Sequence, residues 1–111
     1  MEKPVKGEVV VLPFPFSDLS TSKRRPALVV ATLTGDDVIL CQITSEARED
    51  NYSIHLAKQH FENGNLDSES RIRPNRIFTA DKSIISYKIG NLKKSKIKEV
   101  EDELISIFKK N

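Results

Sequence analysis

The sequence predicts a mainly β fold, a small barrel-like domain packed against one C-terminal helix. Six short runs rich in valine and isoleucine, separated by turn residues, occupy the first 90 residues, which is the pattern of an all-β domain. After residue 93 the apolar residues recur at helical spacing instead. A chain of 111 residues is long enough for one core and too short for two, so we expect a single domain over residues 1–111.

The expected strands are joined by two recognisable connections. The sequence TGDD at 34–37 predicts a tight hairpin turn, and the polar run at 62–70 predicts a longer loop. Pro74 lies within a strand-like run, and because proline cannot donate to a neighbouring strand we expect a bend or a sheet edge there. The six expected strands are residues 7–12, 26–32, 37–44, 52–57, 70–79 and 83–90.

The last expected element is an amphipathic helix. Lysines and glutamates alternate with its apolar residues so that they lie on the opposite side, and Ser95 is placed to cap its first turn. The apolar residues that recur at helical spacing are Ile97, Val100, Leu104, Ile107 and Phe108.

Composition is typical of a soluble globular protein. Hydrophobic residues make up 38% of the chain and charged residues 31%, which argues against a disordered protein. No apolar run approaches the roughly 20 residues that span a bilayer, and the N-terminus lacks the layout of a signal peptide. The single cysteine, Cys41, lies in the apolar run VILCQI, which favours a buried, reduced thiol over a catalytic or metal-binding one. We therefore expect a cytoplasmic protein without a membrane partner.

The net charge of +2 conceals a strong asymmetry along the chain. Residues 36–69 contain eight acidic and two basic residues, a net charge of −6, whereas residues 71–98 contain nine basic residues and one acidic residue, a net charge of +8. A basic stretch of this size favours a nucleic-acid partner. The alternative is that folding mixes the two blocks into an ordinary charged surface, and charge alone leaves both interpretations open.

Most familiar catalytic patterns do not occur in the chain. The sequence contains no glycine-rich phosphate loop, no Cys/His spacing typical of a metal site and no G-x-S-x-G motif. The two histidines stand apart, because His55 alternates with apolar residues in an expected strand and His60 lies in a polar segment. A structural or simply exposed role is favoured for each, so a histidine-dependent mechanism has little support from the sequence.

The run SKRRPALVV at 22–30 places two arginines at the entrance of an apolar strand. Pro26 disfavours the helical region for Arg25, so this guanidinium is presented at the start of an extended strand, where it can bind a phosphate through two hydrogen bonds. Alternate residues of the strand 37–44 share a face that is apolar at Leu40 and polar at Gln42 and Thr44. Periodicity alone favours a strand-end hydrogen bond for the Thr44 hydroxyl over a catalytic role.

At these residues the chain resembles the MazF/PemK family of toxin endoribonucleases. The resemblance covers essentially the whole chain, with its segments in the order and at the spacing of the family. The four segments that carry it are KGEVVVLPFPF at 6–16, RRPALVV at 24–30, QITS at 42–45, and SRIRPNRIFTADKSII at 70–85 followed by IGNL at 89–92.

The resemblance implies a fold, an activity and partners. The implied fold is an SH3-like β-barrel with a C-terminal helix, and the implied assembly is a homodimer. The implied activity is cleavage of single-stranded RNA without a metal or cofactor, through attack of a 2′-hydroxyl on the adjacent phosphorus, leaving a 2′,3′-cyclic phosphate and a 5′-hydroxyl. An antitoxin, expected to be an acidic segment that folds on binding, would hold the toxin silent.

The resemblance also implies roles for individual residues. The arginine before the proline and the threonine of Ile-Thr-Ser, both catalytic in the family, are Arg25 and Thr44 here. Arg71 would add to the basic groove, and the aromatics Phe14 and Phe78 could stack on bases, although these rings, like that of Phe16, are more typical of a core. The residues expected to bind the substrate are Lys23, Arg24, Ser45, Arg73, Arg76 and Phe16.

One segment departs from the family pattern. Many relatives have a longer, glycine-rich loop before the Arg-Pro, whereas this chain has PFPFSDLSTSK at 13–23, so a cut-site preference is not carried over. Two alternatives of different class stay open: a CcdB-like toxin that binds gyrase and catalyses nothing, and a non-catalytic RNA-binding or regulatory module. CcdB-like proteins lack the Arg-Pro and Ile-Thr-Ser pair, and its presence here favours the nuclease.

Overall fold

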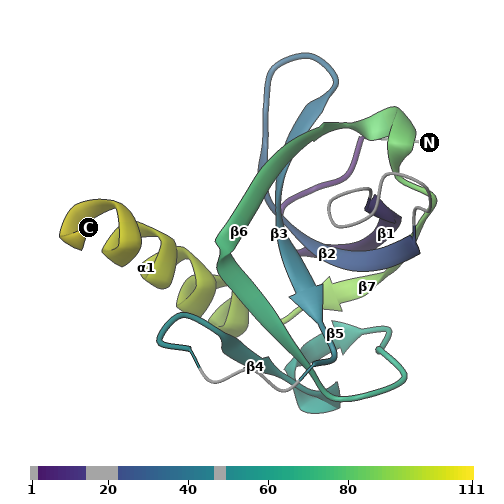
Figure 1. Ribbon diagram of the computed structural model, residues 1–111. Helices are drawn as coiled ribbons and strands as arrows, with labels where there is room; N and C mark the ends of the chain where they lie inside the picture. Colours follow the sequence, from purple (N-terminus) through teal and green to yellow (C-terminus); the bar gives the residue numbers. More distant parts are fainter. Residues whose placement is uncertain (1–2, 15–22, 47–49) are drawn as a thin grey trace.

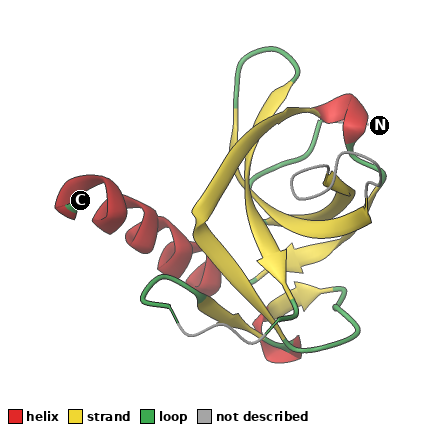
Figure 2. Cartoon of the chain, in the orientation of Figure 1, coloured by secondary structure: helices red, strands yellow, loops and turns green. Residues whose placement is uncertain are grey.

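The computed structural model describes residues 3–14, 23–46 and 50–111. Within these ranges one strongly curved antiparallel sheet is followed by a C-terminal helix that projects from it (Figures 1 and 2). The strands are β1 (Glu8–Phe14), β2 (Lys23–Thr32), β3 (Asp37–Thr44), β4 (Ile54–Leu56), β5 (Phe61–Asn63), β6 (Ser70–Asp81) and β7 (Tyr87–Leu92). Two single-turn 3₁₀ helices, η1 (Lys58–His60) and η2 (Lys82–Ile84), precede β5 and β7, and the helix is α1 (Lys94–Lys110).

The strand order is β4-β6-β3-β2-β1-β7-β5. The outermost strands, β4 and β5, are three residues long, and Ala57 with η1 connects them directly. The sheet therefore curls until its two edges lie near each other, at the bottom of Figure 1. The N-terminal strand β1 lies between β2 and β7, so strands from both ends of the chain meet in the middle of the sheet.

The two faces of the sheet carry separate apolar clusters, because successive strand residues point to opposite sides. The helix-facing side packs against Val100 of α1, and we call the other side the helix-distal face. The buried helix-facing residues are Val9, Leu28, Cys41, Ile43, Ile54, Leu56, Phe61, Ile72 and Leu92. The buried helix-distal residues are Val10, Leu12, Phe14, Ala27, Val29, Val38, Leu40, Ala80 and Ile85.

The turn and the bend expected from the sequence are present. Residues 34–36 form the bend between β2 and β3, as TGDD predicts. Cys41 pairs with Ile77 and the next residue, Gln42, pairs with Arg73, so three residues that begin with Pro74 bulge out of the β3–β6 ladder. Because β6 lies between β3 and β4, proline produces a bend here and not an edge.

Four local expectations differ from the structure. The expected strand 52–57 is shortened to β4, and the region 83–90 begins as η2, where the Asp81 carboxylate accepts a hydrogen bond of 2.8 Å from the Ser83 N–H. Strand β5 lies where a loop was expected, because it pairs with the distant β7. Ser95 is not the helix cap: α1 begins at Lys94, with Lys93 at the cap position two residues before Ser95, and no side chain caps it.

Cys41 is a free, fully buried thiol, as the sequence predicts. Burial raises its pKa to about 12, because a thiolate would lose its hydration in the apolar cluster. Such a thiol is poorly suited to nucleophilic chemistry. Within the described ranges, no helix has both the length and the apolar character needed to cross a bilayer.

Candidate active site

The helix-distal face changes from apolar to polar along the strands. On β3 the buried residues Val38 and Leu40 are followed on the same face by half-buried Gln42 and then by Thr44. On β2 the same face carries Val29 and Ala27 and, towards the start of the strand, Arg25. The apolar core thus ends in a group of polar side chains at the C-terminal end of β3.

Strand register aligns the polar residues of this end in a row. Thr44 on β3 is the partner of Arg71 on β6, and Arg71 is the partner of His55 on β4. Directly paired residues of antiparallel strands point to the same face, so the three side chains share the helix-distal side. On the other side of β3, the last paired position joins Gln42 to Ala27 of β2. Arg25 lies two residues beyond Ala27 and Thr44 two residues beyond Gln42, so the same register brings Arg25 opposite Thr44. We call these four side chains the polar row: Arg25, Thr44, Arg71 and His55.

Arg25 has the placement that the Arg-Pro motif predicts. It lies in extended backbone within β2, opposite Leu12 of β1, and is half-buried. The two preceding residues, Lys23 and Arg24, are exposed in the same strand. A guanidinium that is partly shielded from water and followed by exposed cations is suited to an anionic ligand.

Thr44 is buried, with only 6% of its surface exposed. Its Oγ1 accepts a hydrogen bond of 3.1 Å from the backbone N–H of Glu46, so the strand-end hydrogen bond that periodicity favours is present. This bond fixes the hydroxyl oxygen and leaves the O–H free to donate, because a hydroxyl carries both an acceptor and a donor. The structural bond and a donating role are therefore compatible.

The other residues expected at the RNA surface fall into different environments. Ser45 is exposed and lines an open depression with Arg71 and His55. Arg76 is exposed in the β6 bulge, beside a second depression that also contains Gln42 and Phe78. Phe16 lies outside the described residues.

Arg73 and Phe14 are buried. Arg73 is 7% exposed, and its Nη2 lies 3.9 Å from Asp50 Oδ2. The pKa of Asp50 is lowered, chiefly by the backbone N–H groups of Tyr52 and Ser53 and to a smaller extent by the charge of Arg73. Phe14 packs edge to face against Phe78, with ring centroids 5.1 Å apart. Phe14 thus belongs to the core, and Arg73 is a buried residue of β6 opposite Gln42 of β3.

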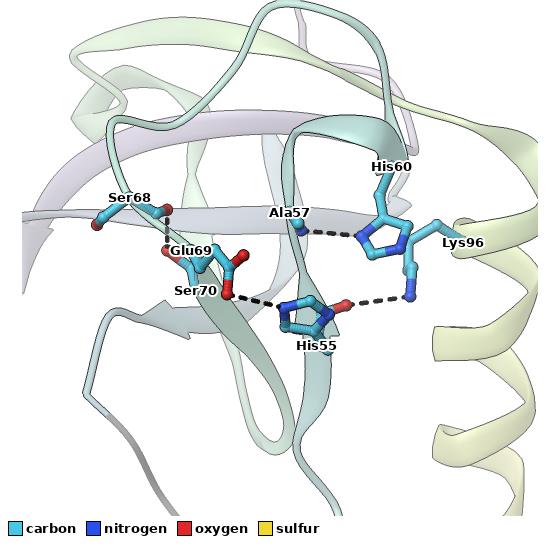
Figure 3. Close-up of polar contacts among 7 residues, drawn as sticks. All are labelled: His55, Ala57, His60, Ser68, Glu69, Ser70 and Lys96. Atoms are coloured by element: carbon cyan, nitrogen blue, oxygen red, sulfur yellow. Dashed lines mark hydrogen bonds and ion pairs between the residues drawn. The ribbon is translucent and has the colours of Figure 1, made fainter.

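A polar cluster that sequence reasoning missed adjoins the row (Figure 3). His55 Nε2 lies 3.3 Å from Glu69 Oε2, and its ring contacts that of His60 at a centroid distance of 5.7 Å. The buried Lys96 of α1 donates to the His55 carbonyl oxygen at 3.0 Å and to Glu99 at 2.8 Å. Alternation around His55 was visible in the sequence, but its pairing with Arg71 depends on a register that no local pattern reveals. Among the residues that the structure describes, this cluster included, no three His, Cys, Asp or Glu side chains converge as metal ligands would.

The second histidine of this cluster makes fold stability depend on pH. His60 Nδ1 accepts a hydrogen bond of 2.9 Å from the Ala57 N–H, which requires the neutral ring. Desolvation, followed by the charge of Lys96, lowers the His60 pKa below its usual 6.5. The unfolded chain therefore takes up a proton first as pH falls, so this contribution to stability is complete above 6.5 and is lost as pH falls through the folded-state pKa.

We expect His60→Asn to reduce this pH dependence, because an asparagine oxygen can take the place of Nδ1 as acceptor and does not titrate. Urea unfolding of parent and variant at pH 7.5 and pH 5 would measure it. The parent should lose more stability between the two pH values than the variant, since all other titrating groups are common to both. Equal losses would mean that His60 is not the group responsible.

Comparison with known proteins decides the family. Residues 5–108 match the family model described as the PemK-like, MazF-like toxins of type II toxin–antitoxin systems. This chain belongs to that family. The sequence segments that resemble the family, including the Arg-Pro and Ile-Thr-Ser motifs, all lie within the matched range. In this PemK/MazF family member the two motifs meet at the polar row.

Solved structures of the family have the same fold. An endoribonuclease in complex with its cognate antitoxin, from Mycobacterial species, has a TM-score of 0.76 at 13% identity over 97% of both chains. A MazE–MazF crystal structure from Deinococcus radiodurans has a TM-score of 0.74 at 20% identity over 100% of both chains. MazF from the same organism has a TM-score of 0.74 at 23% identity over 97% of this chain and 98% of that one. The curated proteins include no match to this sequence.

The likeness to these structures establishes the fold of this family member. It is a mainly antiparallel β half-barrel with one C-terminal helix, which confirms the SH3-like barrel expected from the sequence. At sequence identities of 13–23%, these structures establish the fold alone.

Proposed function

We propose that this PemK/MazF family member is a metal-independent, ribosome-independent endoribonuclease that cleaves single-stranded RNA. The observation that supports this most directly is the polar row, in which Arg25 and Thr44 flank the end of the β2–β3 ladder and Arg71 adjoins Thr44. Two positively charged guanidinium groups beside a positioned hydroxyl are complementary to a negatively charged phosphodiester. The buried Cys41, with its raised pKa, is unsuited to nucleophilic catalysis.

The proposed reaction needs no nucleophile from the protein. The RNA 2′-oxygen attacks the adjacent phosphorus, a P–O2′ bond forms, and the P–O5′ bond breaks. The products are a 2′,3′-cyclic phosphate and a 5′-hydroxyl. Arg25 stabilises the negative charge that develops on the phosphoryl oxygens, and Thr44 donates its O–H to a phosphate oxygen or holds the 2′-hydroxyl in line.

Exposed cations beside the row would hold the RNA backbone. Lys23 and Arg24 extend from Arg25 along β2, and Arg76 lies in the β6 bulge on the other side. Each phosphate contact releases counterions, so binding should weaken steeply as salt rises. Ser45, exposed directly after Thr44, is suited to hydrogen bonding with a neighbouring nucleotide.

The partners follow from the same family. One solved relative is a complex with its cognate antitoxin and another contains MazE with MazF. By extension, we propose that an acidic antitoxin segment folds onto the basic surface of this chain and silences it. We further propose that residues 1–111 form one domain that acts in the cytoplasm as a homodimer.

Cleavage of a mixed single-stranded RNA by purified protein in excess EDTA tests the proposal, with fragment ends read by mass spectrometry. We expect cyclic-phosphate and 5′-hydroxyl ends at a rate that EDTA leaves unchanged. Intact RNA that is nevertheless bound would favour the non-catalytic RNA-binding module. Inhibition of gyrase without RNA cleavage would favour the CcdB-like alternative.

A further inference from the structure

The proposed reaction requires a group that accepts the proton of the 2′-hydroxyl. A guanidinium offers only hydrogen-bond donors, so Arg25 and Arg71 are unsuited to accept this proton, and the neutral hydroxyl of Thr44 is too weak a base to do so by itself. His55 is the fourth member of the polar row and the one side chain in it of a type that exchanges protons near neutral pH. This inference rests on the proposed function and concerns the same site.

The register places His55 within reach of a phosphodiester bound at the row. Adjacent strands lie about 5 Å apart, so Thr44 and His55, two strands apart, are separated by about 10 Å with Arg71 between them. A phosphate held by Arg71 would therefore have the threonine hydroxyl on one side and the imidazole on the other. The His55 side chain is 49% exposed and lines the depression shared with Ser45 and Arg71, so substrate has access to it.

Glu69 gives the ring a defined orientation. Its carboxylate lies 3.3 Å from His55 Nε2, diagonally across the β4–β6 pair. A carboxylate accepts hydrogen bonds, so the neutral ring carries its hydrogen on Nε2 and has Nδ1 as a proton acceptor. This is the arrangement in which a carboxylate both orients a histidine and stabilises the imidazolium that forms during the reaction.

Several polar and charged groups surround His55. Glu69 faces it directly, and Glu46 lines the same depression. Arg71 is its cross-strand neighbour, the ring of His60 lies beside it, and Lys96 of α1 binds its carbonyl oxygen. Carboxylates, cations and a second imidazole therefore all lie around His55.

We propose that His55 is the general base of RNA cleavage and that Glu69 is its positioning residue. His55 Nδ1 takes the proton from the 2′-hydroxyl as the P–O2′ bond forms. The 5′-oxygen leaves with the electron pair of the P–O5′ bond and takes a proton from water, and the imidazolium returns its proton to solvent. Atoms and charge balance without a further reactant.

Single-turnover cleavage by His55→Gly and His55→Gln, compared with the parent, tests the assignment. Removing a general base lowers rates by about 10²–10⁴-fold, and we expect losses in that range for both variants. Added imidazole should restore part of the rate of His55→Gly, where the ring has left a space, and none of the rate of His55→Gln. Glu69→Gln should give a smaller loss, together with a changed dependence of rate on pH.

Two controls separate catalysis from folding and binding. Lys82→Ala removes a cation that pairs with Asp36 beyond the opposite end of β6, away from the polar row, and should cleave at the parental rate. Affinity for a 2′-O-methylated RNA, which lacks the nucleophile, should be the same for the parent and the His55 variants.

The outcomes distinguish this inference from the proposed function. Parental rates in both His55 variants, or a slow His55→Gly that imidazole does not rescue, would overturn the role of His55 while leaving the nuclease in place. A parent protein that cleaves no RNA would overturn the nuclease itself, and this inference with it.

Discussion

Arg25→Ala is expected to lower the rate of RNA cleavage by about 10²–10³-fold, the loss typical of removing one preorganised donor to a developing anion. Arg25 is half-buried in β2, at the end of the ladder that also positions Thr44. Its guanidinium is therefore partly shielded from water, where charge stabilisation is stronger than on an open surface. Single-turnover cleavage of one defined RNA, with excess protein, would measure the loss.

Two further variants show whether charge alone explains the effect. Arg25→Lys keeps the positive charge but loses the two parallel donors, so we expect it to recover only part of the rate. Lys82→Ala removes a cation in η2, after the opposite end of β6, where Lys82 pairs with Asp36, and should cleave like the parent. If Arg25→Ala cleaves RNA at a rate within about threefold of the parental rate, Arg25 does not stabilise the transition state.

Among alanine substitutions of the glycines in the chain, Gly64→Ala is expected to lower the free energy of unfolding most, by about 4 kcal/mol or more. Gly64 has a φ of +77°, and an added Cβ would lie 2.2 Å from the carbonyl oxygen of Ile89 and 2.7 Å from the Cα of Gly90. Both neighbours are backbone atoms of β7, so relief requires β5 to separate from β7. Urea unfolding would measure the loss.

Gly35→Ala is the matched control. Gly35 has a similar φ of +87° in the β2–β3 turn, but no atom lies within 4 Å of an added Cβ. Its cost should be that of the left-handed backbone alone, about 1–2 kcal/mol. The difference between the two variants isolates the contact with β7, and equal costs would mean that β5 moves aside without penalty.

Local patterns in the sequence were sufficient for the elements that local forces determine. The run of β-branched residues in β1 to β3, the TGDD turn and the helical spacing of Ile97 and Val100 each predicted an element that is present. The polar end of the face with Leu40 and Thr44 could also be predicted, because alternation is a property of the strand itself.

Other features depend on contacts between distant segments. Strand β5 exists because Phe61 and Asn63 pair with β7, about 30 residues later, and its own three residues have no strand pattern that would predict it. His55 joins the polar row only through the β4–β6 register, so the sequence favoured a structural or exposed role for it. The contact between Arg73 and Asp50, which lies in a separate loop, likewise joins residues that no local pattern connects.

The position of β1 in the middle of the sheet has a consequence for synthesis. One side of β1 pairs with β2, which follows soon after, but the other pairs with β7, whose last residue is Leu92. A nascent chain emerging from the ribosome therefore has an unpaired edge on β1 until β7 has been translated, and contacts so distant in sequence form slowly. Although Arg25 and Thr44 are translated early, the half-barrel that supports them is completed only after β7 has been translated.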